Sequence, residues 1–183
     1  EGKYLPEIKK CDISSVKGSV IVKDFSKEKF KMNLKSNKVN VIKILPGGVV
    51  TAKDTAEIEL DANGEFVRNP GVDLVKVAVV ERHQGTGNVA CGFLKGYGIK
   101  EGAVALSVAH DSHNIIVVGV NDEEMEFAVN SLIEQEGGIV LVKEGKVIES
   151  MPMPIAGLMS DQSGEWVDQK LTDIHEKAYE ELG

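Results

Sequence analysis

The sequence predicts an α+β fold that is rich in β-structure, with mostly antiparallel sheets and a few helices, including one at the C-terminus. Most of the chain before residue 120 consists of short apolar runs or of apolar residues that alternate with polar ones, as in strands. The apolar spacing of a helix occurs only later, around Met125 and between Glu165 and Leu182. This order, with strands first and mixed elements afterwards, is typical of α+β proteins.

Residues 1–60 are predicted to be β-rich. Four segments have the period of two or the apolar run of a strand, namely Ser19–Val22, Phe30–Leu34, Val39–Leu45 and Val49–Leu60. Pro46-Gly47-Gly48 is a strong turn signal, and Asp61-Ala62-Asn63-Gly64 is typical of a hairpin loop. We therefore predict a β-rich segment over residues 1–60 and an α+β domain over residues 61–183.

Two later segments, Leu74–Val80 and Ile115–Val120, are nearly continuous runs of apolar residues, most of them β-branched. Runs of this kind predict strands that are covered on both faces of the sheet. Val89–Leu94 and Gly102–Val108 are predicted as further strands between them. The core of the sheet is therefore expected in this part of the chain.

Helices are predicted after the second buried strand. Asn121 or Asp122 can cap a helix that ends near Gly137-Gly138, and a βαβ crossover through this helix is compatible with the pattern. Ile139–Ser150 predicts a hairpin, and the prolines that follow it are excluded from a central strand. Glu165–Leu182 predicts a C-terminal helix with one apolar side.

The composition bounds the class of protein. With 183 residues, 42% of them hydrophobic and 27% charged, the chain has room for one domain or two small ones and is not a disordered protein. No stretch approaches the roughly 18 apolar residues of a membrane-spanning helix, and no basic-then-apolar leader opens the sequence. Because the chain begins with Glu1-Gly2, we expect a processed product, a trimmed chain or a fragment.

The net charge and the spacing of the cysteines indicate which partners and which kinds of site are not expected. The net charge of −8, from 29 acidic and 21 basic residues, argues against nucleic acid as the partner. The lysines that crowd the first quarter are interleaved with Asp and Glu, which is typical of solvated strand faces. Cys11 and Cys91 lack the spacing of a zinc cluster or a redox pair, and Cys91 is expected to be a small buried residue. Reduced thiols are the default in the cytoplasm, where we expect the protein.

The first candidate site is His110-Asp111-Ser112-His113-Asn114, between two apolar runs. Polar groups in a buried setting cost free energy unless each finds a partner. The histidines and Asp111 could bind a heterocycle, relay a proton or ligate a metal, although about three protein ligands are needed and no carboxylate-histidine group lies nearby. The alternative is a turn whose polar groups bond to one another, in which Asp111 accepts hydrogen bonds from its own backbone. Both interpretations stay open.

The second candidate site is Glu81-Arg82-His83, at the end of the first buried strand. If the two buried strands are neighbours, both polar clusters meet at one end of the sheet. A surface ion pair of little energetic value is the alternative, which we favour for Arg82, whereas we favour a site role for His83. Gly85 and Gly87 could form an anion-binding nest, although a mobile loop is the simpler interpretation.

Three motifs together carry a family resemblance. They are Glu81–Asn88, Ser107–Ile115 and Pro154–Ser160. In this order and spacing they resemble the C-terminal region of bacterial adenine deaminases, which belong to the amidohydrolase superfamily. The resemblance spans residues 39–161, and residues 1–38 and the last helix carry no equally clear motif.

The resemblance implies a parent enzyme that hydrolyses adenine to hypoxanthine and ammonia in a (β/α)₈ barrel, with divalent manganese or iron. This chain has no HxH motif and is too short for a barrel of about 250 residues. The barrel would therefore precede it, and this chain is expected to bind no metal itself and to be inactive alone. The early strands, from Ser19 to Leu60, would then suit the small β-sandwich that flanks such barrels.

Three roles remain open under this resemblance. In the first, Glu81–His83 and His110–Asn114 lie near the substrate without being catalytic and help to enclose adenine, because His, Asp and Asn can match the donors and acceptors of a purine. In the second, the chain is a structural or assembly domain, with the motifs at an interface between domains or subunits. The third role is a module that binds a small polar ligand. The expected partners are the upstream barrel, adenine and, in a homo-oligomer, a second copy, with neither nucleic acid nor a membrane.

Overall fold

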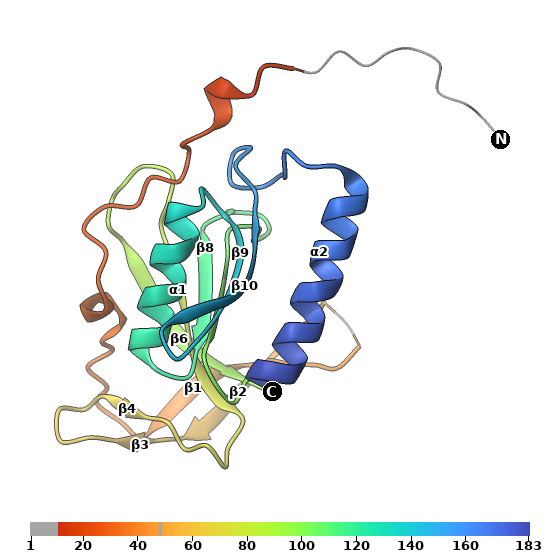
Figure 1. The fold of residues 1–183 in the computed structure, drawn as a ribbon. Helices are drawn as coiled ribbons and strands as arrows, with labels where there is room; N and C mark the ends of the chain where they lie inside the picture. The colour runs from red at the N-terminus through yellow and green to blue at the C-terminus, as the bar shows by residue number, and fades with distance from the viewer. Residues whose placement is uncertain (1–10, 48) are drawn as a thin grey trace.

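An eight-stranded sheet organises the chain, with one helix packed against each face (Figure 1). The computed structural model describes residues 11–47 and 49–183. The strands of the sheet are β1 (Lys38–Ile44), β2 (Thr51–Glu57), β5 (Leu74–Val80), β6 (Val89–Lys95), β7 (Ala103–Leu106), β8 (Ile115–Gly119), β9 (Gly138–Lys143) and β10 (Lys146–Pro152). They lie in the order β10-β9-β7-β8-β5-β6-β1-β2, and neighbouring strands are antiparallel except β1 and β6. The predicted α+β class is confirmed.

The remaining elements connect or flank this sheet. They are η1 (Ser14–Val16), η2 (Lys27–Phe30), β3 (Glu59–Leu60), β4 (Phe66–Val67), α1 (Asp122–Glu134), α2 (Gly164–Lys177) and η3 (Ala178–Leu182). β3 and β4 pair as a separate hairpin around the predicted turn at Asp61–Gly64. α1 connects β8 to β9, which lie on either side of β7 and are parallel to each other, so the βαβ crossover is present.

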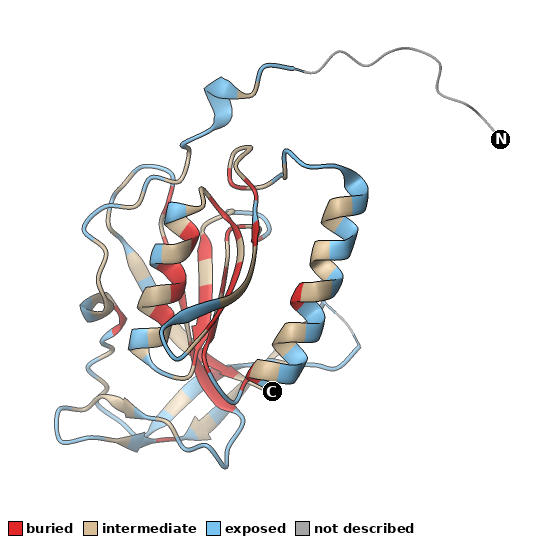
Figure 2. Ribbon diagram, in the orientation of Figure 1, coloured by how far each residue is buried: buried red, intermediate tan, exposed pale blue. Residues whose placement is uncertain are grey.

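The central strands are buried on both faces, which explains their continuous apolar sequence. Val117 of β8 packs in the cluster under α1, whereas its neighbour Val118 packs in the cluster under α2. In the same way, Val140 and Val142 of β9 face α1, and Leu141 faces the other side. Figure 2 shows the buried residues gathered on these strands and on the facing sides of the helices. Both predicted buried strands are confirmed.

α1 begins at the predicted N-cap, but the residue that ends it is not one of the predicted glycines. The side chain of Asn121 accepts a hydrogen bond from the backbone N–H of Glu124 and caps the helix. At the other end, the N–H groups of Glu136 and Gly137 donate to the carbonyls of Ile133 and Leu132, which is a Schellman motif. The left-handed residue of this motif is Glu136, with φ +64°, rather than one of the two glycines.

The predicted glycine cap at Gly137-Gly138 therefore serves another purpose. A Cβ on Gly138 would lie 1.9 Å from the carbonyl oxygen of Met151, on the paired strand β10. A Cβ on Gly137 would lie 2.6 Å from Cα of Gly157. Glycine is needed here because two other backbone segments come too close for a side chain.

The C-terminal segments agree with their predictions. Met151 and Pro152 close β10, which is the outermost strand and so tolerates proline. α2 and η3 together cover the predicted helical tail. Ile174 and Leu182 are buried there under the sheet, and Trp166 packs against the same cluster.

Two of the early predicted strands are wrong. Residues 19–22 and 30–34 form no strand, although Val20 and Val22 pack against the core under α1. Phe30 ends the short helix η2 and is completely buried. Residues 16–34, which we call the N-terminal strap, pack against the core without joining the sheet. The alternation of apolar and polar residues in the strap therefore reflects alternate contact with the core rather than pairing with a neighbouring strand.

The predicted strand over Val49–Leu60 is interrupted. β2 ends at Glu57, and Ile58 then turns inward, with its N–H donating to the carbonyl of Asn37 at 2.8 Å before β3 begins. β1 and β2 are joined to the later strands through β6, and the division of the chain at residue 60 stays a prediction. Residues 1–10, with three of the clustered lysines, lie outside the described residues. Over the described ranges, no helix has the length and apolar character that a bilayer crossing requires.

Replacement of a core leucine tests the two-sided packing. Leu132→Ala is expected to lower the free energy of unfolding by about 2–5 kcal/mol, because the side chain is completely buried between α1 and the sheet. Leu45→Ala is the matched control, since Leu45 is 36% exposed and its loss should cost only about 0.5 kcal/mol. Chemical denaturation measures both, and equal losses would contradict the assignment of the core.

Candidate functional site at the end of the sheet

The two predicted polar clusters meet at one end of the sheet. β5 and β8 pair antiparallel with Val80 opposite Ile115, so the residue after Val80 and the residue before Ile115 leave the sheet side by side. The backbone N–H of Arg82 lies 3.4 Å from the side-chain oxygen of Asn114. The prediction that the clusters meet if these strands are neighbours is confirmed.

Arg82 lies inside the domain, with only 1% of its surface exposed. Its Nε and Nη2 donate to the carbonyl oxygens of His113 and Ala156, at 2.5 and 3.1 Å. Among the described residues, no carboxylate lies within ion-pair distance of it. Burial lowers the pKa of its guanidinium. The expected surface ion pair of Arg82 is therefore wrong, because the guanidinium is buried and bonds to backbone carbonyls.

Glu81 organises the glycine-containing loop that follows it. Its carboxylate accepts hydrogen bonds from the backbone N–H groups of His83, Gln84 and Thr86, at 2.5, 2.8 and 2.9 Å, and from the Thr86 hydroxyl. These donors lower the pKa of Glu81 to about 2. The N–H of Thr86, between Gly85 and Gly87, is thus already bound to Glu81, and a carboxylate already lies where this loop would bind an anion.

The loop from Ala109 to Asn114 presents three polar side chains to solvent, those of His110, Asp111 and Ser112. The side chain of His110 is 83% exposed and that of Asp111 is fully exposed. The turn is closed by the N–H of His113, which donates to the carbonyl of Ala109 at 2.7 Å, rather than by Asp111. The carboxylate of Asp111 lies 3.7 Å from Nδ1 of His110 within the loop, and its exposure leaves it accessible to a partner outside the loop.

The histidines of the two clusters lie around this loop. The rings of His110 and His113 meet edge to face with centroids 5.2 Å apart. His83 Nε2 lies 2.8 Å from the carbonyl oxygen of Ser112, although His83 and Ser112 are both exposed. His113 is half-buried, and its Nδ1 has no hydrogen-bond partner among the described residues.

Ser107 and Gly157 belong to the site, although the sequence alone did not identify them as site residues. The hydroxyl of Ser107 donates to the carbonyl of Gly157 at 2.5 Å and accepts from the N–H of Gly138 at 2.7 Å, and Ser107 is completely buried. Gly157 has φ +70°, and a Cβ there would lie 2.7 Å from Nη1 of Arg82. Two signals in the sequence could have found them: a hydroxyl inside an otherwise apolar run, and the position of both residues in the motifs Ser107–Ile115 and Pro154–Ser160.

Three loops thus converge at this end of the sheet, and we call them the three-loop surface. They are Glu81–Asn88, Ala109–Asn114 and Pro154–Ser160. The N-terminal strap lies against two of them, since the N–H of Ile21 donates to the carbonyl of Arg82 and the N–H of Ala156 donates to that of Val16. Ile21 and Met159 are apolar residues that remain 50% and 58% exposed. The surface therefore combines hydrogen-bonding and apolar groups, as contact surfaces of proteins do.

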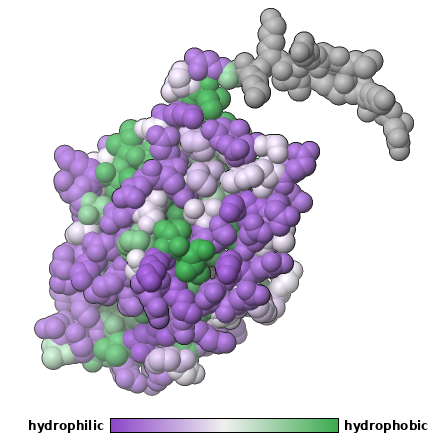
Figure 3. Space-filling view, viewed as in Figure 1, coloured by the Kyte–Doolittle hydropathy of each residue, from purple (hydrophilic) through white to green (hydrophobic). Residues whose placement is uncertain are grey.

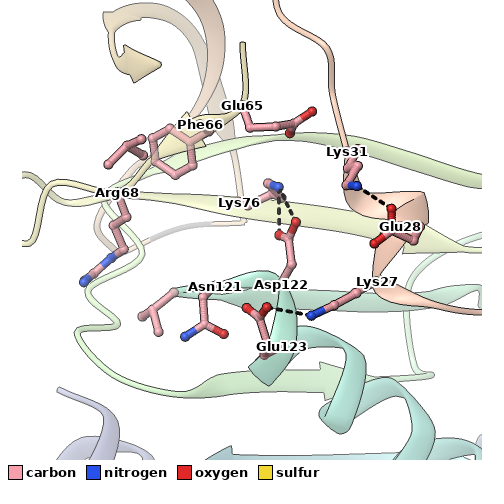
Figure 4. Close-up of a pocket in the computed structure, with 12 residues that line it drawn as sticks. Lys27, Glu28, Lys31, Glu65, Phe66, Arg68, Lys76, Asn121, Asp122 and Glu123 are labelled. Atoms are coloured by element: carbon pink, nitrogen blue, oxygen red, sulfur yellow. Dashed lines mark hydrogen bonds and ion pairs between the residues drawn. The ribbon is translucent and has the colours of Figure 1, made fainter. Parts of the chain in front are cut away.

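A polar cavity of about 610 Å³ lies toward the other end of β5, beside the start of α1 (Figure 4). Its three lysines are each paired with a carboxylate: Lys27 with Glu123, Lys31 with Glu28 and Lys76 with Asp122. Lys76 is only 5% exposed and also donates to the carbonyl of Phe30, which joins the strap to β5. The lysine charges are thus matched by carboxylates, and the cavity lies at a junction between η2, β4, β5 and α1.

Three further features lie outside these regions: the hydrophobic areas of the surface, the thiol of Cys91 and the arrangement of potential metal ligands. Figure 3 shows a mostly hydrophilic face with several small hydrophobic areas. Phe127 and Val147 line a groove beside α1 and β10. Cys91 is half-buried, burial raises the pKa of its thiol, and its sulfur lies 3.7 Å from the carbonyl of Lys29. In the part of the chain that the structure describes, no group of three or more His, Cys, Asp or Glu residues is placed to hold a metal ion.

Fold and surface together define an α+β domain that carries its polar residues in loops at one end of a buried sheet. Residues 48–183 match the family model described as the adenine deaminase C-terminal domain, and the chain belongs to this family. It is 65% identical over its whole length to "Adenine deaminase 2" of Desulfotalea psychrophila, of which it covers 32%. It is 47% identical over 98% of its length to the adenine deaminase of Ligilactobacillus salivarius and 44% identical over 83% to that of Bacillus subtilis, and it covers 31% and 26% of them. The chain thus spans about a third of the length of the curated relatives it matches.

The carboxylate of Glu81 is expected to make the domain sensitive to acid. Its pKa is about 2 in the folded chain against an ordinary value of 4.5. Between these pH values the unfolded chain binds a proton that the folded chain does not, so stability falls as the pH falls. Glu81→Gln removes this contribution and should give a free energy of unfolding that is lower at pH 7 and falls less steeply between pH 4.5 and 2.

Urea denaturation across this pH range measures the effect. Glu57→Gln is the control, because Glu57 is an exposed carboxylate of β2 to which no described residue donates a hydrogen bond. If Glu81→Gln and Glu57→Gln have the same pH profile, Glu81 does not hold the loop.

Proposed function

We propose that this chain is the C-terminal domain of an enzyme that hydrolyses adenine to hypoxanthine and ammonia. The observation that carries the proposal is the 65% identity to a protein named adenine deaminase across the whole of this chain. In the reaction, water adds at the carbon that bears the exocyclic amine, and that amine leaves as ammonia. We assign this chemistry, with its divalent manganese or iron, to a barrel in the two thirds of the relatives that this chain does not cover.

We further propose that the three-loop surface faces the mouth of that barrel and helps to enclose adenine. His110 and Asp111 support this role, since they project from the domain and their side chains are free to contact a partner. A purine presents ring nitrogens and an amine, which imidazole and carboxylate groups can match as donors and acceptors. Closure over the substrate would also exclude bulk water from the reaction.

The competing role is that of a structural or assembly domain, in which the motifs only hold the fold or a subunit interface together. Arg82 and Ser107 favour it for part of the surface, because both are buried and bonded within their own domain. His110 and Asp111 favour the contact role, because their side chains are largely exposed and contact only residues of their own loop. The proposal therefore divides the motifs into a buried support and an exposed contact group. A cytoplasmic location and assembly into homo-oligomers remain part of the proposal.

Substitutions in the full-length enzyme test the contact role. Asp111→Ala and His110→Ala are each expected to lower kcat/KM for adenine by about tenfold, the size of one lost hydrogen bond to substrate. His175→Ala is the matched control, since His175 is exposed on α2, away from the three loops. Steady-state measurement of ammonia release provides the values, and unchanged kcat/KM in both loop variants would rule out contact with the substrate.

The isolated chain provides a second test. With adenine and manganese it is expected to release no ammonia, because the proposed barrel with its metal is missing. Circular dichroism should establish that the chain is folded, and the full-length enzyme serves as the positive control. Ammonia release by the folded chain alone would place the catalytic residues here and contradict the proposal.

A further inference from the structure

We propose that Arg82 is a positioning residue for adenine deamination, which fixes the loop Ala109–Asn114 relative to the loop Pro154–Ser160. This inference rests on the proposed function, because it assumes that the exposed end of the first loop meets the substrate or the barrel. Arg82 acts through the loops, and its own guanidinium is buried away from the surface.

The contacts of Arg82 are unusual for a buried cation. Such a charge is costly to remove from water and is normally paired with a carboxylate. Arg82 instead donates from two nitrogens of one rigid plane to carbonyl oxygens of two different loops, at His113 and Ala156. A planar guanidinium that makes two such bonds fixes both the separation and the orientation of its acceptors. An apolar side chain would fill the space without linking the loops.

The second loop is held so closely that it can serve as the fixed side of this link. Gly157 lies against the guanidinium, where a Cβ would come within 2.7 Å of Nη1. Its carbonyl accepts from the hydroxyl of Ser107, which also bonds to the N–H of Gly138 at the start of β9. Through Arg82, the sheet therefore determines where the backbone of His113 lies, and with it the neighbouring side chains of the exposed loop.

The test compares two buried cations in the full-length enzyme. Arg82→Met is expected to raise KM for adenine by about tenfold, the size of one hydrogen bond from a charged group. Lys76→Met is the matched control, because Lys76 is also buried and donates to a backbone carbonyl, but toward the other end of β5. Both substitutions should lower the melting temperature, while KM of Lys76→Met should stay within about twofold of the unmodified enzyme.

Arg82→Lys completes the series and keeps the test valid if Arg82→Met does not fold. It retains the charge and can bond one carbonyl at a time, so KM should lie between those of Arg82→Met and the unmodified enzyme. An unchanged KM in Arg82→Lys, together with a melting temperature that falls as in Lys76→Met, would assign Arg82 a purely structural role and overturn the inference.

The loop variants separate this inference from the proposed function. If Asp111→Ala and His110→Ala impair the enzyme while the Arg82 variants behave like Lys76→Met, only the positioning role of Arg82 fails. If the loop variants have no effect, the contact role itself fails. A higher KM in the Arg82 variants with no effect in the loop variants would also overturn the inference, because Arg82 would then act through another element.

Discussion

Burial of the central sheet on both faces is the constraint on which the rest of the structure depends. β5, β8 and β9 are covered by α1 on one side and by the cluster under α2 on the other, so most of their side chains are apolar whichever way they point. Lys76 of β5 is a buried exception and is paired with Asp122, and the polar groups of the site lie near the ends of the strands. This is why the motifs of the family lie in loops at one end of the sheet.

The polar groups at that end divide into two kinds. Glu81, Arg82 and Ser107 are used within the domain, where each bonds to backbone groups of the loops. His110 and Asp111 are exposed beyond them. An exposed loop that is supported by buried hydrogen bonds can present side chains in a fixed arrangement, which is what a contact with a substrate or another domain requires.

The two buried cations on and after β5 show how similar chemistry serves different purposes. Lys76 is paired with Asp122 and with the carbonyl of Phe30, so it closes a junction between the strap, the sheet and α1. Among the described residues, the side chain of Arg82 has only carbonyl partners, and these belong to two loops that are far apart in sequence. Lys76 thus forms a neutralised ion pair, whereas Arg82 fixes the position of the surface loops relative to the sheet.

The sequence alone determined the fold class, the buried strands, both helices and the family, because apolar periodicity and motif spacing are local properties of the chain. It also predicted that the two polar clusters would meet, on the condition that their strands were neighbours. It misassigned residues 19–22 and 30–34, since alternate burial against a core has the same period as a strand. Only the tertiary structure decided that Arg82 is buried and links two loops, because its acceptors are the carbonyls of His113 and Ala156, and backbone carbonyls leave no trace in residue identity.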